Sequence, residues 1–569
     1  MAGHDNDSTT QTPAWWSEYG PGVGPQWRPP GERSLVELLE ASARANGPRP
    51  AFTVCLGRRL TASHSYNTVH AEAEAFAAFL RCWLGLRPGD RVAIQLPNSL
   101  GYPVAAFGAL RAQAVLVNIN PMFTSAEMRQ QLADCGARVL VIADRFADKI
   151  APGTRDTAIE TVITASLLHG FAAATRYTLH GLMRYIRREI PNPPRTATTL
   201  ARALAIGARY RAELAPLATP RGGDDTAVLQ YTGGTTGTPK GAELSHSNLL
   251  ANISQTRAIA GPVLRDGQDT VLTALPLYHI FAFTFNLLVF YSSGCHNVLC
   301  PTPRPPSRLR PAFEQFPITK LSAVNTLFQA LLRERWFREA PPPHLDFAVA
   351  GGTALQPRVG ADWQDVTGIA VYEGYGLSEA SPVVAVNPPG GEPRPGMIGV
   401  PLPGTEIRLF NDSGADITAC GGPGELAVRG PQVMRGYWQQ PEATAASFRG
   451  DWFLTGDIAT QDERGYLRIV DRKKDMIDVS GFNVYPGEVE ARLTQHPAIV
   501  EAGVVGVARP NGGEDVRAVV VASDPQLTQD EVIAWARSAL TNYKCPCEVS
   551  FRDALPKSAV GKILRHQLR

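Results

Sequence analysis

The chain has 569 residues, of which 44% are hydrophobic, and 55 Lys and Arg nearly balance 53 Asp and Glu. This length is several times the usual size of one domain, so we expect a multi-domain protein with a large buried core. The net charge of +2 excludes a global electrostatic footprint for nucleic acid. The composition is typical of a soluble globular protein.

Eight cysteines are spread along the chain, and none forms a C-x-x-C pair. The pair at 545–547 has the wrong spacing for a zinc knuckle or a thioredoxin-like site. Cys295, His296 and Cys300 have some likeness to a metal-site fragment, but buried small apolar side chains are the interpretation we favour. Residues 1–19 lack an apolar signal segment, and we expect a protein of the reducing cytosol.

Residues 1–33 are predicted to form a polar, Pro-rich arm, and regular elements are expected from Ser34 onward. Ser34 followed by Glu37 is the pattern of a capping box, which predicts a helix that begins there. Short apolar runs then alternate with helix-like runs, as in α/β layers. The pattern predicts a strand, a helix and a second strand at residues 90–96, 105–113 and 137–142.

Residues 167–190 carry the pattern of an amphipathic helix. At about 100° per residue, one arc holds apolar side chains and another holds basic ones. The two arcs contain Leu168, Phe171, Leu179, Leu182, Ile186 and Ile190, and Arg176, His180, Arg184, Arg187 and Arg188. Such a helix fits an anionic membrane surface, although we favour an ordinary surface helix that docks its apolar side on the core.

From residue 348 the sequence becomes rich in Gly and turns, with short strand-like runs. A charged run at 471–475 then precedes a tail of alternating strand-like and helix-like segments. Because the composition changes at this run, we predict a hinge there. The predicted organisation is an N-terminal arm at 1–33, a large domain at 34–470, a hinge at 471–475 and a small domain at 476–569.

Residues 231–241, YTGGTTGTPKG, are the strongest chemical signal in the sequence. The glycines let backbone N–H groups approach an anion closely and the threonines add hydroxyl donors, which predicts a polyphosphate cradle. The loop is not a Walker A motif, because Lys240 lies between Pro239 and Gly241 instead of opening a helix as Gly-Lys-Ser/Thr.

This loop and six further motifs resemble, in order, the signatures of the AMP-forming acyl-CoA synthetases of the adenylate-forming superfamily. The resemblance covers about residues 34–569, and the wording of 324–328 and 471–477 looks like that of bacterial long-chain fatty-acid–CoA ligases. The further motifs are LPLYH at 275–279, YGLSE at 375–379, TGD at 455–457, DRKKD at 471–475, SGFNVYP at 480–486 and PKSAVGK at 556–562.

The resemblance implies an α/β fold. It implies a large multi-subdomain N-terminal region, with layered sheets flanked by helices and a small β-barrel-like part, and a small mobile α+β C-terminal domain. It also implies a reaction in two steps. ATP first activates a medium-to-long-chain fatty acid to acyl-AMP, with release of pyrophosphate. CoA then converts acyl-AMP to acyl-CoA, with release of AMP. The first step joins two anions and needs cationic groups and a metal, which the resemblance gives as Mg²⁺.

The implied partners are the fatty acid, ATP and CoA, without nucleic acid. A homodimer is left open, and so is a peripheral contact through 167–190 with the inner face of the membrane. Among catalytic groups, the resemblance assigns Lys562 to bridge carboxylate and α-phosphate and His279 to lie near the acyl carboxylate. It assigns Mg²⁺ to Glu379 and Thr235, whose oxygens suit a hard cation.

Further roles follow from matching motif positions. Tyr375 is implied to stack on adenine, Ser378 to contact phosphate where the family more often has Thr, and Asp457 to bind the ribose hydroxyls with Arg472 beside it. The full set of implied ATP-binding residues is Thr232, Gly233, Gly234, Thr235, Thr236, Gly237, Lys240, Gly351, Gly352, Glu373, Gly374, Tyr375, Gly376, Ser378, Asp457 and Arg472.

The small domain is implied to rotate between the two half-reactions. Lys474 matches the hinge position, and rotation would withdraw Lys562 and present the face of Ser480 and Gly481 to CoA. The acyl chain needs an apolar slot. The candidates for it are Phe281, Phe283, Phe285, Asn325, Phe328, Val383 and Val384.

Two other interpretations are open at this stage. One is another acid-activating ligase of the superfamily, for aryl acids or for transfer to a carrier-protein thiol. The other is a non-catalytic nucleotide-binding or membrane-sensing protein that keeps the fold, against which the presence of Lys562, Glu379 and Asp457 argues.

Overall fold

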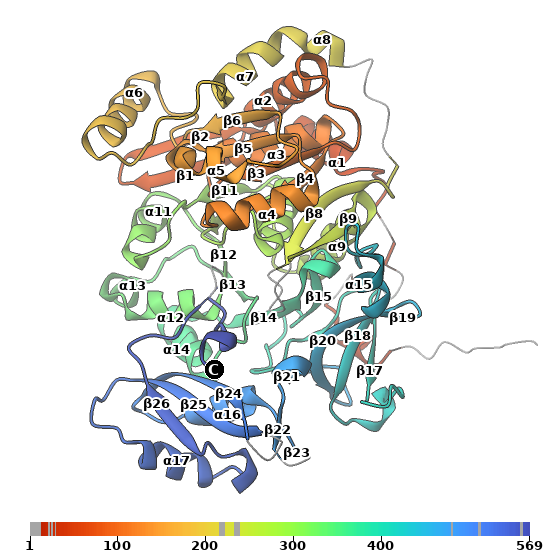
Figure 1. Ribbon diagram of the computed structural model, residues 1–569, viewed down its shortest axis with the longest axis vertical. Helices are drawn as coiled ribbons and strands as arrows, with labels where there is room; N and C mark the ends of the chain where they lie inside the picture. Colours follow the sequence, from red (N-terminus) through yellow and green to blue (C-terminus); the bar gives the residue numbers. More distant parts are fainter. Residues whose placement is uncertain are drawn as a thin grey trace, which may run out of the picture.

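The computed structural model describes residues 13–20, 23, 27–28, 30–214, 222–232, 239–479, 482–509, 514–557 and 561–569. Figure 1 shows two large sheets with their helices in the N-terminal part, a smaller sheet beside them, and the C-terminal part below. The mixed α/β architecture agrees with the fold class expected from the sequence.

The first sheet has seven strands, and all its pairs are parallel except β8–β9. Parallel pairs need crossover connections, which explains the helices between its strands. The predicted strands at 90–96 and 137–142 are confirmed as β3 and β5. In spatial order the strands are β7 (Thr198–Thr199), β6 (Thr161–Ala165), β5 (Val139–Ala143), β3 (Arg91–Gln95), β4 (Val115–Asn118), β8 (Thr226–Thr232) and β9 (Lys240–Ser245).

The second sheet has nine strands, parallel from β14 to β1 and antiparallel at both ends. Its parallel strands are short and buried, as expected for strands covered on both faces. In spatial order they are β16 (Val400–Pro401), β15 (Val383–Val386), β14 (Val371–Gly376), β13 (Phe347–Ala350), β12 (Lys320–Ala323), β10 (Thr270–Thr273), β11 (His296–Leu299), β1 (Pro50–Gly57) and β2 (Leu60–Ser65).

The smaller sheets lie toward the C-terminus. The five-stranded antiparallel sheet contains β17 (Glu406–Phe410), β18 (Gly424–Arg429), β19 (Phe448–Arg449), β20 (Trp452–Gln461) and β21 (Leu467–Arg472). The C-terminal part contains β22 (Ile477–Val479), β23 (Phe482–Val484), α16 (Pro486–Leu493), β24 (Ile499–Ala508), β25 (Glu514–Ala522), α17 (Gln529–Arg537) and β26 (Glu548–Phe551).

Helices cover the large sheets. The first begins where the sequence predicts: Ser34 Oγ accepts from the N–H of Glu37, whose carboxylate accepts from the N–H of Arg33. The helices are α1 (Leu35–Asn46), α2 (Tyr66–Ala78), α3 (Gly101–Arg111), α4 (Ser125–Cys135), α5 (Ile150–Gly153), α6 (Ala173–Gly181), α7 (Leu200–Gly207), α8 (Arg211–Leu214), α9 (His246–Ala260), α10 (Phe290–Ser292), α11 (Arg310–Gln315), α12 (Asn325–Arg333), α13 (Arg335–Glu339), α14 (Pro357–Thr367) and α15 (Pro441–Ala446).

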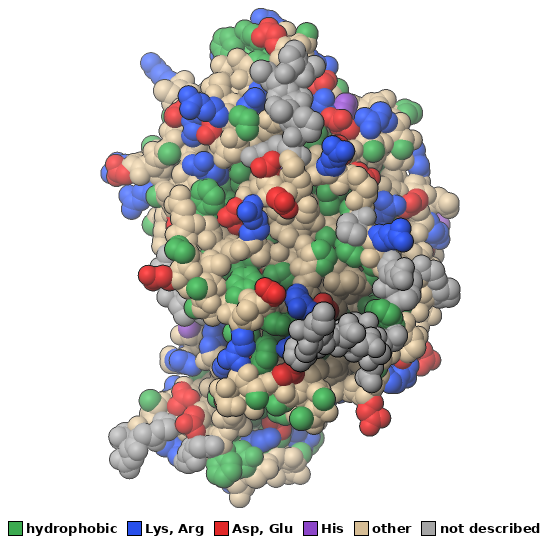
Figure 2. Space-filling view, turned by 90° about the vertical axis from the view of Figure 1, so that its right-hand side faces the viewer, with side chains coloured by type: hydrophobic (Ala, Val, Ile, Leu, Met, Phe, Trp, Pro, Cys, Tyr) green, Lys and Arg blue, Asp and Glu red, His purple; other side chains and the backbone are tan. Residues whose placement is uncertain are grey.

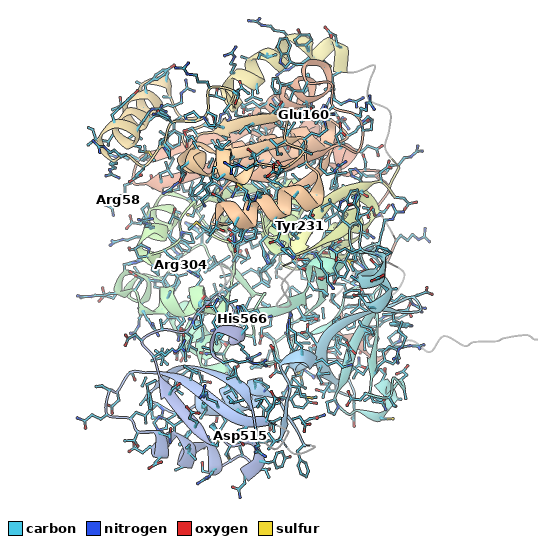
Figure 3. All side chains as sticks on the ribbon, viewed as in Figure 1. Arg58, Glu160, Tyr231, Arg304, Asp515 and His566 are labelled. Carbon is cyan, nitrogen blue, oxygen red and sulfur yellow. The ribbon has the colours of Figure 1, made fainter. Side chains whose placement is uncertain are left out.

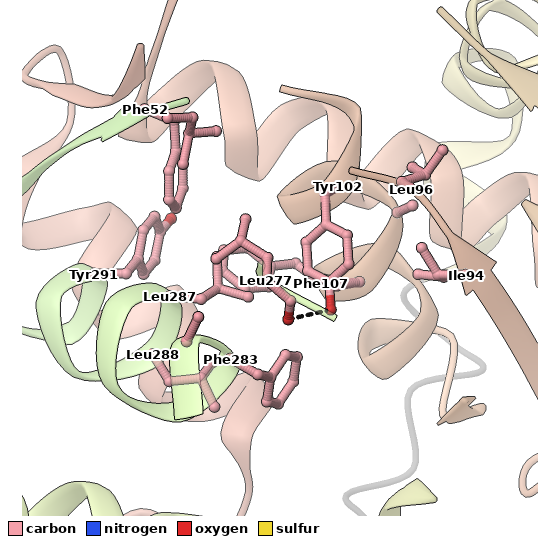
Figure 4. Close-up of a cluster of buried hydrophobic side chains, with 14 of the residues drawn as sticks. Phe52, Ile94, Leu96, Tyr102, Phe107, Leu277, Phe283, Leu287, Leu288 and Tyr291 are labelled. Atoms are coloured by element: carbon pink, nitrogen blue, oxygen red, sulfur yellow. Dashed lines mark hydrogen bonds between the residues drawn. The ribbon is translucent and has the colours of Figure 1, made fainter. Parts of the chain in front are cut away.

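The main core joins the two large sheets. Figure 4 shows Phe52, Phe107 and Tyr291 packed together, with the rings of Phe107 and Tyr291 5.0 Å apart. In the same core the Tyr102 hydroxyl donates to the carbonyl of Leu277 at 2.8 Å, which satisfies a buried polar group. Separate apolar clusters between Ile477 and Leu568 form the core of the C-terminal part.

The surface carries charges of both signs. On the face in Figure 2, Lys and Arg are interspersed with Asp and Glu, in keeping with the net charge of +2. Within the described ranges, no helix is long and apolar enough to cross a bilayer.

The structure corrects the long helix predicted at 167–190. Gly170 adopts a left-handed φ of +83° inside a turn, so the helical segment begins only at Ala173 and ends at Ile186. Leu168 and Phe171 are buried in the core as predicted for the apolar arc, but Ile186 is 74% exposed. The segment stands out at the edge of the seven-stranded layer (Figure 1).

The described part of the N-terminal arm is packed on the protein. The Tyr19 hydroxyl donates to the carbonyl of Pro401 at 2.7 Å, and Glu18 forms an ion pair with Arg464 at 2.6 Å. The arm is therefore held against the strands that border the site described next.

Candidate active site

A cavity of about 1390 Å³ opens between the N-terminal part and the end of the chain. We call residues 561–569, which contribute to its wall, the C-terminal strap. Tyr231, Arg304 and His566, labelled in Figure 3, reach it from three separate segments. Predicted site residues gather here from across the sequence. Those that line the cavity are Thr232, Lys240, His279, Phe281, Gly351, Gly352, Gly374, Tyr375, Gly376, Ser378, Glu379, Asp457, Arg472, Lys474 and Lys562.

The Gly- and Thr-rich loop joins two antiparallel strands at the cavity. Strands β8 and β9 are antiparallel, and Thr232 at the end of β8 pairs with Lys240 at the start of β9. This agrees with the expectation that the loop is not a strand-to-helix P-loop. The Lys240 ammonium lies 5.0 Å from the ring centroid of Tyr437. Outside the described residues lie Gly233, Gly234, Thr235, Thr236 and Gly237.

Tyr375, Asp457 and Arg472 form one hydrogen-bonded group on the cavity wall. The Tyr375 hydroxyl donates to Asp457 Oδ2 at 2.5 Å, and Arg472 Nε lies 3.1 Å from Oδ1. Asp457 and Arg472 face each other across the β20–β21 pair, so sheet register fixes their contact. Asp457 is only 4% exposed, and these two donors compensate the burial of its charge.

A second carboxylate, Glu379, faces the cavity from the short turn that Ser378 opens. Burial raises the pKa of Glu379, while the Tyr437 hydroxyl, which donates to its Oε1 at 2.8 Å, acts in the opposite direction. A carboxylate oxygen beside an open polar space is a suitable donor for Mg²⁺, which binds one or two carboxylates together with substrate phosphates.

The backbone approaches the cavity closely at two glycines. A Cβ on Gly376 would lie 2.3 Å from the carbonyl oxygen of Pro382, and one on Gly351 would lie 2.9 Å from the ring of Phe281. No larger residue fits at Gly376 without movement of the backbone. These glycines let the Pro382 carbonyl and the Phe281 ring pack directly on the main chain of the cavity wall.

Glu373 is not among the side chains that line the cavity, and its part in ATP binding stays a prediction. Its carboxylate accepts from the N–H groups of Leu355 at 3.0 Å and Gly396 at 3.3 Å and is 6% exposed. Burial raises the pKa of Glu373 to about 7. The side chain therefore braces two loops behind the wall of the site.

His279 lines the cavity in its neutral form. Burial lowers the pKa of His279 to about 4, so the ring is uncharged at pH 7. Its Nδ1 accepts from the N–H of Phe281 at 3.3 Å, which leaves the ring proton on Nε2. The ring is thus a hydrogen-bond donor and not a cation.

Lys562 enters the cavity from the C-terminal strap. Burial, and then the charge of Arg472, lower the pKa of Lys562 to about 8, while Asp457 acts in the opposite direction. The preceding Gly561 has a φ of +78°, and a Cβ there would lie 2.7 Å from Thr326 Oγ1 on α12. The left-handed turn at Gly561 thus lets the strap pack on the large sheet region.

A buried ion cluster fixes this strap to the predicted hinge. Arg565 contacts Asp471 at 3.3 Å, Asp475 at 3.1 Å and Glu490 at 2.8 Å. Within the hinge, Lys473 contacts Glu425 of β18, in the five-stranded sheet, at 2.8 Å. Lys474 lines the cavity, and the predicted CoA-binding residues Ser480 and Gly481 lie outside the described ranges.

Of the predicted acyl-slot residues, Phe281, Phe285 and Val383 line the cavity, whereas Phe283, Asn325, Phe328 and Val384 do not. Phe328 is fully buried, and its ring packs edge-on against Trp363 with centroids 4.8 Å apart. Asn325 Oδ1 accepts from the N–H of Gln356 at 3.0 Å. Helix α12 thus turns these two side chains toward the core and α14, and their part in acyl binding stays a prediction.

Further apolar side chains line the cavity that the sequence analysis did not single out. They come from α9, β13, β15 and neighbouring segments and look like ordinary core residues in the sequence. Ile259, Val386 and Leu402 belong to one apolar cluster, against which Val383 packs. The residues not singled out are Ile259, Ala260, Phe347, Val349, Val386 and Leu402.

Comparisons with known proteins agree with this geometry. A long-chain-fatty-acid–CoA ligase from Escherichia coli O157:H7 is 44% identical over 98% of this chain and 97% of its own length. A feruloyl-CoA synthase from Amycolatopsis is 35% identical over 85% of this chain and 89% of its own length.

Among solved structures, ATP-bound MatB from Rhodopseudomonas palustris superposes with a TM-score of 0.81 at 29% identity, covering 94% of this chain and 98% of MatB. The apo form of MatB gives a TM-score of 0.71. Residues 39–438 match the AMP-binding enzyme family, and residues 488–562 match the AMP-binding enzyme C-terminal domain. The chain belongs to the AMP-binding enzyme family.

Proposed function

We propose that this protein activates a medium-to-long-chain fatty acid with ATP to acyl-AMP and then forms acyl-CoA, releasing pyrophosphate and AMP. The observation that carries the proposal is one cavity lined by two chemically different groups of side chains. Asp457, Arg472 and Lys562 supply charge, and side chains from α9, β13 and β15 supply an apolar surface. The similarity to a long-chain-fatty-acid–CoA ligase over nearly the whole chain supports this substrate class.

In the first half-reaction, a carboxylate oxygen of the fatty acid attacks the α-phosphorus of ATP, and the bond to pyrophosphate breaks. The Lys562 ammonium bridges the two anions, whose attraction to it is strong because the site is buried. Tyr375 stacks on adenine and Asp457 accepts from the ribose hydroxyls. The loop after Thr232 and the Ser378 hydroxyl contact the phosphates.

His279 orients the acid, because a neutral ring with its proton on Nε2 donates to a carboxylate oxygen without adding charge. Glu379, together with Thr235, would hold Mg²⁺. When bound, this ion supplies charge neutralisation at the phosphate oxygens.

In the second half-reaction, the CoA sulfur attacks the acyl carbonyl carbon and the bond to AMP breaks. Lys562 has no role in this step, so the small domain at 476–569 rotates about Lys474, in the hinge at 471–475, relative to the large domain at 34–470. Rotation separates Gly561 of the C-terminal strap from Thr326 on α12 and brings Ser480 and Gly481 to CoA. The better match to ATP-bound MatB than to apo MatB supports assigning the described arrangement to the first half-reaction.

A substrate panel tests the function. We expect ATP–pyrophosphate exchange to be fastest with fatty acids of graded medium-to-long length, and CoA-dependent AMP release to follow the same order. Fastest exchange with benzoates, cinnamates or amino acids would overturn the fatty-acid assignment. Transfer to a carrier-protein thiol in preference to CoA would overturn the acceptor. Nucleotide binding without any acyl-AMP would overturn catalysis.

We also propose a peripheral membrane contact through residues 167–190, at the inner face of the membrane. Tyr177 and Tyr185 are 72% and 76% exposed beside Ile186, and Arg184, Arg187 and Arg188 lie in the same segment. Aromatic, apolar and basic groups together suit an anionic interface. Charge reversal at the three arginines should weaken binding to anionic liposomes, and unchanged binding would refute the contact. A homodimer stays a prediction, which sedimentation tests.

A further inference from the structure

Two histidines and a glutamate meet outside the cavity, where the edge strand β2 of the nine-stranded sheet meets the segment that follows β6 of the seven-stranded sheet. His64 belongs to β2, Glu72 to α2, and His169 to the turn before α6. One ligand atom from each side chain lies within 4.8 Å of the other two. None of the three lines the active-site cavity. We call them the His64–Glu72–His169 cluster.

The hydrogen bonding of His64 directs one ring nitrogen at the Glu72 carboxylate. Its Nδ1 lies 3.1 Å from the carbonyl oxygen of Ser63, which only accepts, so Nδ1 carries a proton. Its Nε2 is buried and lies 3.3 Å from Glu72 Oε2, with no other polar partner among the described residues. A nitrogen and a carboxylate oxygen at this separation are held together by a positive charge between them, either a proton or a metal ion.

His169 is brought to the same carboxylate by a dedicated turn. Its Nε2 lies 2.7 Å from Glu72 Oε2. Leu168 and Phe171 anchor the turn in the core, and Gly170 has a φ of +83°. A Cβ on Gly170 would lie 2.7 Å from Cε1 of His64, so only glycine lets the turn come this close.

We propose that the His64–Glu72–His169 cluster binds one divalent transition-metal ion of the Zn²⁺ type. The ligands are the Nε2 atoms of both histidines and a carboxylate oxygen of Glu72, and water takes the fourth position. Imidazole and carboxylate donors suit Zn²⁺, whereas Mg²⁺ prefers oxygen alone. His64 already shows the backbone hydrogen bond that orients a metal-binding histidine.

The geometry is close to that of a tetrahedral site. Ligand bonds of about 2.0–2.2 Å put neighbouring ligand atoms about 3.3 Å apart, which is the separation of His64 Nε2 and Glu72 Oε2. His169 needs to move outward by about half an ångström, and its Nε2 proton is released when the metal binds. Solvent reaches the site, because the side chain of Glu72 is 26% exposed. Binding would fix the turn from which α6 starts.

Calorimetry with Zn²⁺ and the full-length protein tests the proposal, with Mg²⁺ in excess and no substrate. We expect one site, at least about tenfold weaker in His169→Ala and in Glu72→Gln. The control is His180→Ala, because His180 also faces a carboxylate, that of Asp144 at 3.6 Å, without a second histidine. That variant should bind as the wild type does.

Two further measurements separate this site from adventitious binding. Co²⁺ should give the visible bands of a four-coordinate ion without a sulfur charge-transfer band, and Zn²⁺ should slow hydrogen exchange at residues 166–171. No stoichiometric binding by the wild-type protein would overturn the proposal, whatever the variants do. Equal affinity of wild type and His169→Ala, with both folded by circular dichroism, would also overturn it. Neither result depends on ligase activity.

Discussion

The charge of Lys562 makes the first half-reaction sensitive to pH. Burial and the nearby Arg472 lower the pKa of Lys562 from its usual value of 10.5 to about 8. A lysine is cationic below its pKa, so the bridging charge is lost as the pH rises through about 8. We therefore expect kcat/KM for ATP, which reports the free enzyme, to fall on the alkaline side.

The size of the fall follows from this pKa. With a pKa of about 8, roughly 90% of Lys562 is charged at pH 7 and roughly 10% at pH 9, a tenfold loss of kcat/KM. With an unshifted pKa of 10.5, almost all of it would stay charged at pH 9. His279, with a pKa of about 4, does not titrate in this interval.

Fatty-acid-dependent ATP–pyrophosphate exchange without CoA is the appropriate assay, because it avoids titration of the CoA thiol. The control is Lys562→Arg, whose guanidinium stays charged above pH 12. The kcat/KM of Lys562→Arg should stay constant between pH 7.5 and 10, whatever its value at pH 7. An alkaline limb that is the same in wild type and Lys562→Arg would refute the reasoning.

Five further substitutions test separate parts of the account. Lys562→Ala should abolish acyl-AMP formation but spare thioester formation from supplied acyl-AMP. Lys474→Pro should slow the second half-reaction more than the first, because proline restricts the hinge. Phe328→Ala should lower the free energy of unfolding by about 3–5 kcal/mol without altering chain-length preference, which Phe281→Ala should alter. As pH rises from 4.5 to about 7, wild type should lose about 3 kcal/mol of unfolding free energy relative to Glu373→Gln, because the folded protein holds the Glu373 proton more tightly.

Each expectation has a contradicting outcome. Equal loss of both half-reactions in Lys562→Ala, measured separately, would remove its specific role. Unchanged rates in Lys474→Pro would show that the hinge lies elsewhere. A changed chain-length profile in Phe328→Ala, from the graded-acid assay, would return that ring to the acyl slot. Parallel stability curves from urea unfolding of wild type and Glu373→Gln at each pH would show that the carboxyl is ionised when folded.

Local patterns in the sequence were sufficient for much of the fold. The apolar runs that became β3 and β5 are short and bounded by turns, and Ser34 caps α1 as its spacing predicts. The polar residues of the site could also be predicted from the sequence, because Tyr375, Glu379 and Asp457 belong to motifs that follow one another in a fixed order. All three line the cavity.

The remaining features depend on tertiary geometry. A period of 3.6 residues continues through 167–190, yet the left-handed Gly170 delays the helix to Ala173. Phe328 and Asn325 carry no local mark that distinguishes a core-facing side chain from a slot-facing one. The apolar lining of the cavity and the His64–Glu72–His169 cluster each consist of side chains from segments far apart in sequence. These side chains come together only when the sheets assemble.

The most direct test of acyl-AMP chemistry follows one oxygen atom. The protein is incubated with ATP, CoA and a long-chain fatty acid that carries ¹⁸O at both carboxyl oxygens. The masses of the products are then measured by mass spectrometry. Because a carboxylate oxygen attacks the α-phosphorus and leaves with it, AMP should carry one ¹⁸O atom and pyrophosphate none. Unlabelled AMP formed together with acyl-CoA would contradict the mechanism.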